Sequence, residues 1–188
     1  GVTVDAYVLY TNQYYQINGQ GSMELPLLGA YIYTITPTSG GGCVVYGTNI
    51  TLSNGEQIPV QDLKVGMKTL SYDPKTGELI TTTVSQIKVL NASYIMVING
   101  NIEVTGLNIQ PIFVKFENGS VGWTMIGNLN YTIQLYCHLN NSWVPVTSLK
   151  IIFGNFTVYD IVTARQISGG YVYSDYIANG YLLDTKLA

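Results

Sequence analysis

Apolar and polar residues alternate with a period of two along most of the chain, in short runs rich in Val, Ile, Thr and Tyr. This alternation is typical of β-strands that turn one face towards a core. No stretch of a dozen residues has the three-and-four apolar spacing of a helix, so helix is expected only as a turn near Gln61 to Val65. Hairpin turns are indicated at Asn54-Gly55, Asn99-Gly100, Asn118-Gly119 and Pro74-Lys75-Thr76-Gly77. The pattern predicts an all-β fold.

A change of composition at residues 37–42, PTSGGG, indicates a flexible linker between two ordered parts. Before it, three strand-like runs (VTVDAYVLY, QYYQING and LLGAYIYTITP) resemble the last strands of a small sandwich. So short a segment buries too little surface to be stable alone. We therefore predict an N-terminal β segment at residues 1–42 and a domain at 43–188. The segment is expected to pair with material absent from this chain, with another subunit, or with the domain that follows.

Composition narrows the classes of function. Hydrophobic residues make up 47% of the chain and charged residues 10%, which is enough for a packed core and argues against disorder. The net charge is −3 and Lys and Arg form no block, so nucleic acid is excluded as the main partner. No window of about 18 apolar residues is present, so no membrane span is expected.

Six Asn-x-Ser/Thr triplets and sixteen tyrosines favour an extracellular or cell-surface glycoprotein, whose partners would include neighbouring subunits of a surface assembly. A chain rich in Asn, Ser and Thr also produces such triplets by chance, and both interpretations stay open. The triplets begin at Asn49, Asn91, Asn118, Asn130, Asn140 and Asn155.

Two blocks of the chain carry a family resemblance. The stretch CVVYGTNITLSNGEQIPVQDLKVG, residues 43–66, resembles the opening block of the Hint family, the self-processing fold of inteins and hedgehog proteins. The matching positions are Cys43, Thr48, Asn54-Gly55, Pro59, Leu63 and Gly66. Met67 departs from the pattern, because an Asp usually follows the glycine.

The stretch from Val158 to Lys186 resembles the family's closing blocks. Val158-Tyr159-Asp160 matches its VYD motif, and residues 176–180, YIANG, match the turn before the last strand. The resemblance implies a flat horseshoe of β-strands built from two similar halves, preceded here by the short β segment. It also implies self-processing. No cofactor or metal is expected, since one His and two Cys cannot fill a tetrahedral metal site without carboxylates.

In that chemistry Cys43 attacks the carbonyl of Gly42, and the acyl group moves from the amide nitrogen to sulfur through a five-membered ring. Gly42 has no side chain to hinder the attack. Because the thioester is less stable than the amide, the fold has to strain the peptide and protonate the departing amine.

In the family the acid comes from a Thr-x-x-His motif, and the matching stretch here is EVTGLNIQPIFV, residues 103–114. Alignment on the proline places Gln110 at the His position, whereas alignment on Thr105 places Asn108 there. Neither residue is a His, and an amide cannot donate a proton to the amine. We expect slowed chemistry or a relic of it.

Further candidates each have a plainer interpretation. Asp160 either relays a proton to or from the thiol or fixes a turn, and Thr48 either supports the nucleophile or reflects strand propensity. His138, the only histidine, is more often a loop residue than a catalyst at such a position. Cys137 is either a buried, inert thiol or the partner of Cys43 in a disulfide, which would remove the nucleophile.

Inteins end in His-Asn, because the Asn cyclises to release the chain. Here Asp184-Thr185-Lys186 follow Leu183, so splicing is not expected. The leading hypothesis is a module that cleaves or transfers its own residues 1–42, with water, an amine or another small nucleophile as acceptor. The alternatives are a catalytically lost Hint fold in a surface appendage or virion, and an adhesin domain held by a Cys43–Cys137 disulfide.

Overall fold

The computed structural model describes residues 3–8, 13–18, 21–24, 31–36, 42–73 and 75–185. Within these ranges the chain forms β-strands and three 3₁₀ turns and no α-helix, which confirms the all-β prediction. None of its helical turns in these ranges is long and apolar enough to cross a membrane. The 3₁₀ turns are η1 (Val60–Asp62), η2 (Ile126–Asn128) and η3 (His138–Asn140). The first overlaps the turn predicted near Gln61.

The N-terminal segment forms an antiparallel sheet in the order β2-β1-β4, which confirms the three strand-like runs. Its strands are β1 (Thr3–Val8), β2 (Gln13–Asn18) and β4 (Tyr31–Thr36). A further strand, β3 (Gly21–Glu24), was not predicted and pairs with the first residues of β15 (Leu149–Ile167). The segment thus pairs with the domain that follows. The linker itself, residues 37–41, lies outside the described residues, so the domain boundary stays a prediction.

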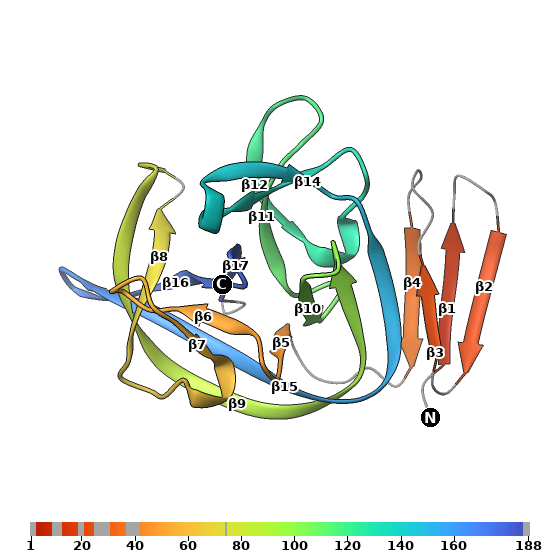
Figure 1. Cartoon of the computed structure of the whole chain (residues 1–188), viewed down its shortest axis with the longest axis horizontal. Helices are drawn as coiled ribbons and strands as arrows, with labels where there is room; N and C mark the ends of the chain where they lie inside the picture. The colour runs from red at the N-terminus through yellow and green to blue at the C-terminus, as the bar shows by residue number, and fades with distance from the viewer. Residues whose placement is uncertain are drawn as a thin grey trace.

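The remaining strands form one large sheet in the order β12-β11-β13-β17-β16-β15-β5-β10-β9-β8, with β6, β7 and β14 pairing at its sides. In Figure 1 these strands run around an open, curved body, and β1, β2 and β4 stand to one side of it. The strands are β5 (Cys43–Val45), β6 (Asn49–Thr51), β7 (Gln57–Pro59), β8 (Lys68–Asp73), β9 (Glu78–Ile98), β10 (Ile102–Thr105), β11 (Pro111–Lys115), β12 (Val121–Met125), β13 (Gln134–Cys137), β14 (Ser142–Pro145), β16 (Gly170–Ala178) and β17 (Tyr181–Asp184).

Two long strands give the body its curvature. β9 has 21 residues and β15 has 19, and they pair antiparallel from Leu149↔Ile98 to Ala164↔Thr83. The register shifts between Phe153 and Phe156 and again between Val162 and Thr163. Such bulges bend a strand and increase its twist, so the pair sweeps around the body in Figure 1 rather than crossing it.

The two halves repeat one local structure. In the first half, buried Val60 begins a 3₁₀ turn, and the Leu63 N–H donates to the Val60 carbonyl. In the second half, Ile126 and Leu129 do the same, and each turn leads towards a strand, β8 or β13. This repetition agrees with the predicted horseshoe of two similar halves.

The predicted nucleophile lies in the middle of the sheet. β5 is paired on one side with β15 and on the other with β10. Val44 and Val104 belong to the main buried core, whereas Cys43 packs in a smaller cluster with Val45 and Val158. A thiol in this position is shielded from water by both neighbouring strands.

Candidate active site

Cys43 opens β5 and is fully buried. Its register partner in β10 is Thr105, and the next residue, Val44, is paired with Tyr159 of β15. Cys43 and Cys137 are both thiols and form no disulfide, so the interpretation of a disulfide-held adhesin is wrong. The thiol of Cys43 is therefore chemically available to the peptide bond that precedes it.

Gly42 is enclosed by two residues of the β10–β11 connection. A Cβ added to Gly42 would lie 2.8 Å from both Cβ and Oε1 of Gln110 and 2.9 Å from its Cα. A Cβ added to Gly106 would lie 2.6 Å from the Gly42 Cα. Gly106 has a φ of +93°, which favours glycine for a second reason. The acyl residue thus fits only because both positions are glycines.

The structure places the candidates of this block differently. Thr105 is the register partner of Cys43, and Gln110 lies against Gly42. Asn108 is exposed to solvent. The turn between them folds back, with the Gln110 N–H donating to the Gly106 carbonyl at 2.8 Å. The separation from Thr105 to Gln110 is five residues instead of three, which is why no single alignment recovered both.

The Gln110 side chain forms hydrogen bonds with main-chain carbonyls. It is 1% exposed, and its Nε2 donates to the carbonyls of Pro111 at 2.9 Å and Asp184 at 3.1 Å. Both amide hydrogens are thereby used, which leaves Oε1 on the side of Gly42. Gln110 holds the acyl residue in place but has no proton to give.

Thr105 has an unusual side chain. It is 1% exposed, and its hydroxyl has no hydrogen-bond partner among the described residues. A buried polar group without a partner costs about 1–3 kcal/mol. An unsatisfied buried hydroxyl beside Cys43 calls for an explanation, and a functional role is one of them.

Tyr176 of β16 was missed by sequence reasoning, which placed it in a structural turn. It is 1% exposed, and its pKa is raised well above 10.0, first by burial and then by Cys43, Asp160 and Asp184. Those three residues come from β5, β15 and β17, so groups on three other strands contribute to the electrostatics of this hydroxyl. A tyrosine within the apolar run YIA was the signal that could have identified it.

Asp175 and Asp184 were also missed as a pair. They are register partners in β16 and β17. Burial raises the pKa of Asp175 to about 7, against the hydrogen bond from the Tyr72 N–H to its Oδ1 at 2.8 Å. Burial likewise raises the pKa of Asp184 to about 6. Two carboxyl groups therefore titrate close to neutral pH, and one of them belongs to Asp184, whose main-chain carbonyl accepts from Gln110.

Asp160 is buried in β15, where its register partner is Lys88 of β9, and it acts electrostatically on Tyr176 as Cys43 does. The structure therefore brings Asp160 to the same group of side chains as the nucleophile. Its proton-relay role stays a prediction.

Two other candidates have positions that favour structural roles. The Thr48 hydroxyl donates to the Val45 carbonyl at 2.7 Å and closes the turn after β5. The His138 N–H donates to the Gly180 carbonyl at 2.8 Å. Gly180 lies in the turn before β17, and the ends of that strand, Tyr181 and Asp184, are roughly 10 Å apart at about 3.3 Å per residue. His138 therefore lies at the opposite end of β17 from the Gln110 contact, beside Cys137, which is paired with Tyr181.

Comparison with solved structures shows that the chain has the fold of inteins and intein-like domains, the Hint fold that its two blocks implied. The DnaB intein of Synechocystis sp. PCC 6803 matches with a TM-score of 0.59 at 18% identity, over 78% of this chain and 100% of that one. A bacterial intein-like domain from Clostridium thermocellum matches with a TM-score of 0.61 at 21% identity, over 76% and 97%. The TvoVMA intein matches with a TM-score of 0.59 at 20% identity, over 77% and 97%.

No protein-family model and no curated protein matches the chain. At these identities the likeness establishes the fold, and the chemistry has to be argued from the side chains of this chain.

Proposed function

We propose that this chain is a self-processing Hint module in which Cys43 attacks the Gly42 carbonyl and cleaves or transfers residues 1–42 without splicing. The observation that carries the proposal is the close packing around Gly42. Gly106 and Gln110 enclose this residue, which immediately precedes the buried Cys43 thiol. The intein-like fold supports the same conclusion.

In the first step a bond forms between sulfur and the Gly42 carbonyl carbon, and the bond from that carbon to the Cys43 nitrogen breaks. The proton that the thiol loses is, in net, the proton that the new amine gains. Asp160 is our candidate to relay it, and Gln110 keeps the acyl residue in position. Because general acid–base help is typically worth about 10²–10⁴ in rate, the absence of a histidine at Gln110 makes this step slow rather than impossible.

The C-terminal side supports cleavage without splicing. The Thr185 hydroxyl donates to the Ser174 carbonyl at 2.6 Å and accepts the Thr163 N–H at 3.2 Å. Thr185 has no side-chain amide with which to cyclise, and its hydroxyl is held by main-chain partners.

One observation favours the alternative of a Hint fold that has lost its reaction and acts as a structural module of a surface appendage or virion. Both amide hydrogens of Gln110 are bonded to main-chain carbonyls, as expected of a side chain that stabilises the fold. This alternative predicts the same structure with an inert Gly42–Cys43 bond.

Denaturing mass spectrometry of the full chain, incubated with dithiothreitol, separates the two. Self-processing predicts a fragment of residues 1–42 and its complement, and Cys43→Ala is expected to abolish both. A chain that stays intact through long incubation at every pH tested, with Cys43 shown to react as a thiol after unfolding, would establish the structural alternative.

We also propose that the protein is displayed outside the cell as a glycoprotein. Support comes from the sequon asparagines, which are exposed except for the half-buried Asn130 (exposed: Asn49, Asn91, Asn118, Asn140 and Asn155). Expression in a secreting eukaryotic host, followed by amidase treatment of the glycans, is expected to lower the mass by several glycan units. A secreted chain with no mass change would refute it.

A further inference from the structure

A cavity of about 430 Å³ lies between β8, β11, β12 and the β16–β17 pair. One part of its wall is aromatic, from Tyr72, Phe113 and Trp123. The Phe113 and Trp123 rings meet edge to face, with centroids 5.3 Å apart, so the wall is already packed. Cavities of this size with a few convergent polar groups are suited to small organic molecules.

The polar part of the wall is mainly acidic. Asp73, Asp175 and Asp184 line the cavity, together with the cations Lys75 and Arg165. Three carboxylates against two cations leave one negative charge when all are ionised. A cation bound there neutralises that charge and also gains from the electron-rich faces of the aromatic rings.

The cavity is linked to Gly42 through Asp184 and Gln110. Asp184, one of its walls, accepts a hydrogen bond from Gln110 through its carbonyl at 3.1 Å, and Gln110 lies directly against Gly42. Only one side chain therefore separates the cavity wall from the residue whose carbonyl would carry the thioester. Asp184 and Cys43 also both act electrostatically on Tyr176.

We propose that this cavity binds a primary amine, carried on an apolar or aromatic body, and that this amine is the acceptor of the Gly42 acyl group. The inference rests on the proposed function, because it needs the Cys43 thioester. The aromatic wall holds the body of the acceptor, and the Asp175–Asp184 pair holds its ammonium group.

The transfer balances without any further reagent. The ammonium loses one proton to the carboxylate pair and becomes a nucleophile. Its nitrogen forms a bond to the Gly42 carbonyl carbon, the bond from that carbon to the Cys43 sulfur breaks, and a second proton passes from nitrogen to the thiolate. The products are an amide of Gly42 and a free Cys43 thiol. Carboxyl groups that titrate near pH 6–7 are well matched to accept such a proton near neutral pH.

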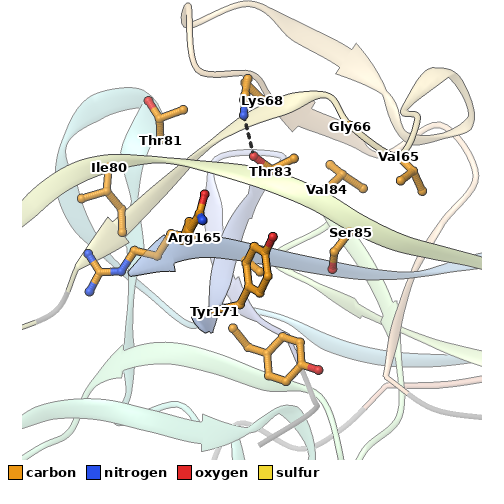
Figure 2. A pocket seen from close by; sticks show the side chains of 13 residues that line it. Val65, Gly66, Lys68, Ile80, Thr81, Thr83, Val84, Ser85, Arg165 and Tyr171 are labelled. Atoms are coloured by element: carbon orange, nitrogen blue, oxygen red, sulfur yellow. Dashed lines mark hydrogen bonds between the residues drawn. The ribbon is translucent and has the colours of Figure 1, made fainter. Parts of the chain in front are cut away.

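A second cavity, of about 810 Å³, lies beside the same strands and provides a contrast. Figure 2 shows Lys68 and Arg165 among its lining side chains, with the Lys68 ammonium donating to the Thr83 hydroxyl. Its described lining contains no carboxylate. It offers an ammonium group no counter-charge, which is why the smaller cavity is the one assigned to the acceptor.

Benzylamine is a suitable probe, because it joins a primary amine to an aromatic ring. With the full chain at pH 8, we expect release of residues 1–42 as the benzylamide, at a rate that saturates with benzylamine concentration. Asp184→Asn and Asp175→Asn are each expected to lower the ratio of aminolysis to dithiothreitol cleavage at least tenfold. The matched control is Asp62→Asn at an exposed aspartate of η1, for which the ratio is expected to stay at the wild-type value.

Binding is measured separately on Cys43→Ala, which cannot form a thioester, by calorimetric titration with benzylamine. A saturable heat that is weakened at least fivefold by adding Asp184→Asn supports the site whether or not the chain is active. Aminolysis that is linear in amine and equal in all variants, with no heat on Cys43→Ala, overturns the acceptor site. Loss of dithiothreitol cleavage in the wild-type chain would instead overturn the proposed function.

Discussion

Gly42→Ala tests whether the close packing of Gln110 against Gly42 positions the acyl residue for the reaction. The added methyl group meets Gln110 at 2.8–2.9 Å, whereas favourable carbon contacts lie at about 3.5–4.0 Å. One of the atoms it meets is the Gln110 Cα, which a change of rotamer cannot move. Overpacking of this kind costs about 1–3 kcal/mol.

The protein can respond to this clash in two ways. Either the folded state becomes less stable, or the Gly42 carbonyl moves away from the Cys43 thiol. We expect the free energy of unfolding, measured in urea, to fall by about 1–3 kcal/mol. We also expect thiol-induced cleavage to slow by about an order of magnitude or more, because a misplacement near 1 Å costs as much as about 10²-fold. Gly154→Ala is the control, since its added Cβ would approach nothing closer than 3.4 Å.

Shortening Gln110 to alanine in the Gly42→Ala background tests the same reasoning, since Cα and Cβ of residue 110 both remain. No rescue of cleavage is expected. If Gly42→Ala keeps wild-type stability and cleaves at a rate within a factor of two of the wild type, the close packing of Gln110 against Gly42 does not constrain the acyl residue.

Three further predictions concern single side chains. Gln110→His is expected to accelerate thiol-induced cleavage at least tenfold, and most strongly below neutral pH, where imidazolium is populated. Asn108→His is expected to have little effect. If Asn108→His accelerates cleavage and Gln110→His does not, the contact between Gln110 and Gly42 does not govern the reaction. The pKa of Asp175 is raised from 3.8 to about 7 in the folded state, so its stabilising contribution is complete below about pH 4 and is lost as pH rises through 7. In urea titrations, Asp175→Asn should therefore reduce the fall in unfolding free energy with rising pH, and at pH 8 it should unfold at a higher urea concentration than the wild type. If the unfolding free energy of Asp175→Asn depends on pH as that of the wild type does, the burial argument is wrong. Thr105→Val removes a buried hydroxyl that has no partner among the residues the structure describes, so it is expected to leave stability equal or higher while slowing cleavage. A fall in the free energy of unfolding of more than about 1 kcal/mol would mean that the hydroxyl forms a hydrogen bond.

The sequence predicted those features that depend on neighbours along the chain. The all-β class follows from two-residue alternation, and the Asn54-Gly55, Asn99-Gly100 and Asn118-Gly119 turns all connect paired strands. The adjacency of Gly42 and Cys43 is likewise local. The structure agrees with the sequence here because each of these features depends on only a few consecutive residues.

Features that depend on pairing between distant strands were not predictable. The choice between Gln110 and Asn108 depended on how the loop after β10 folds back, which a three-residue motif cannot specify. Asp175 and Asp184 meet only because β16 and β17 pair, and the residues that act electrostatically on Tyr176 come from three other strands. Strand β3 was missed because its four residues carry too short a pattern, and its partner in β15 is more than a hundred residues away.

That short pairing determines what would follow the proposed cleavage of the Gly42–Cys43 bond. Residues 21–24 lie beside residues 150–153 in the same sheet, so the fragment that carries the acyl group is also an edge strand of the domain that attacks it. Cutting the backbone and parting the two pieces are then separate events, and the second requires the main-chain hydrogen bonds of that edge to break. A cleaved chain would elute as a single species under native conditions and would separate into two fragments only when it is unfolded. The pairing acts only after an acceptor has taken the acyl group, when it keeps residues 1–42 beside the domain. The earlier return of the thioester to the amide does not need it, because the amine and the sulfur both belong to Cys43.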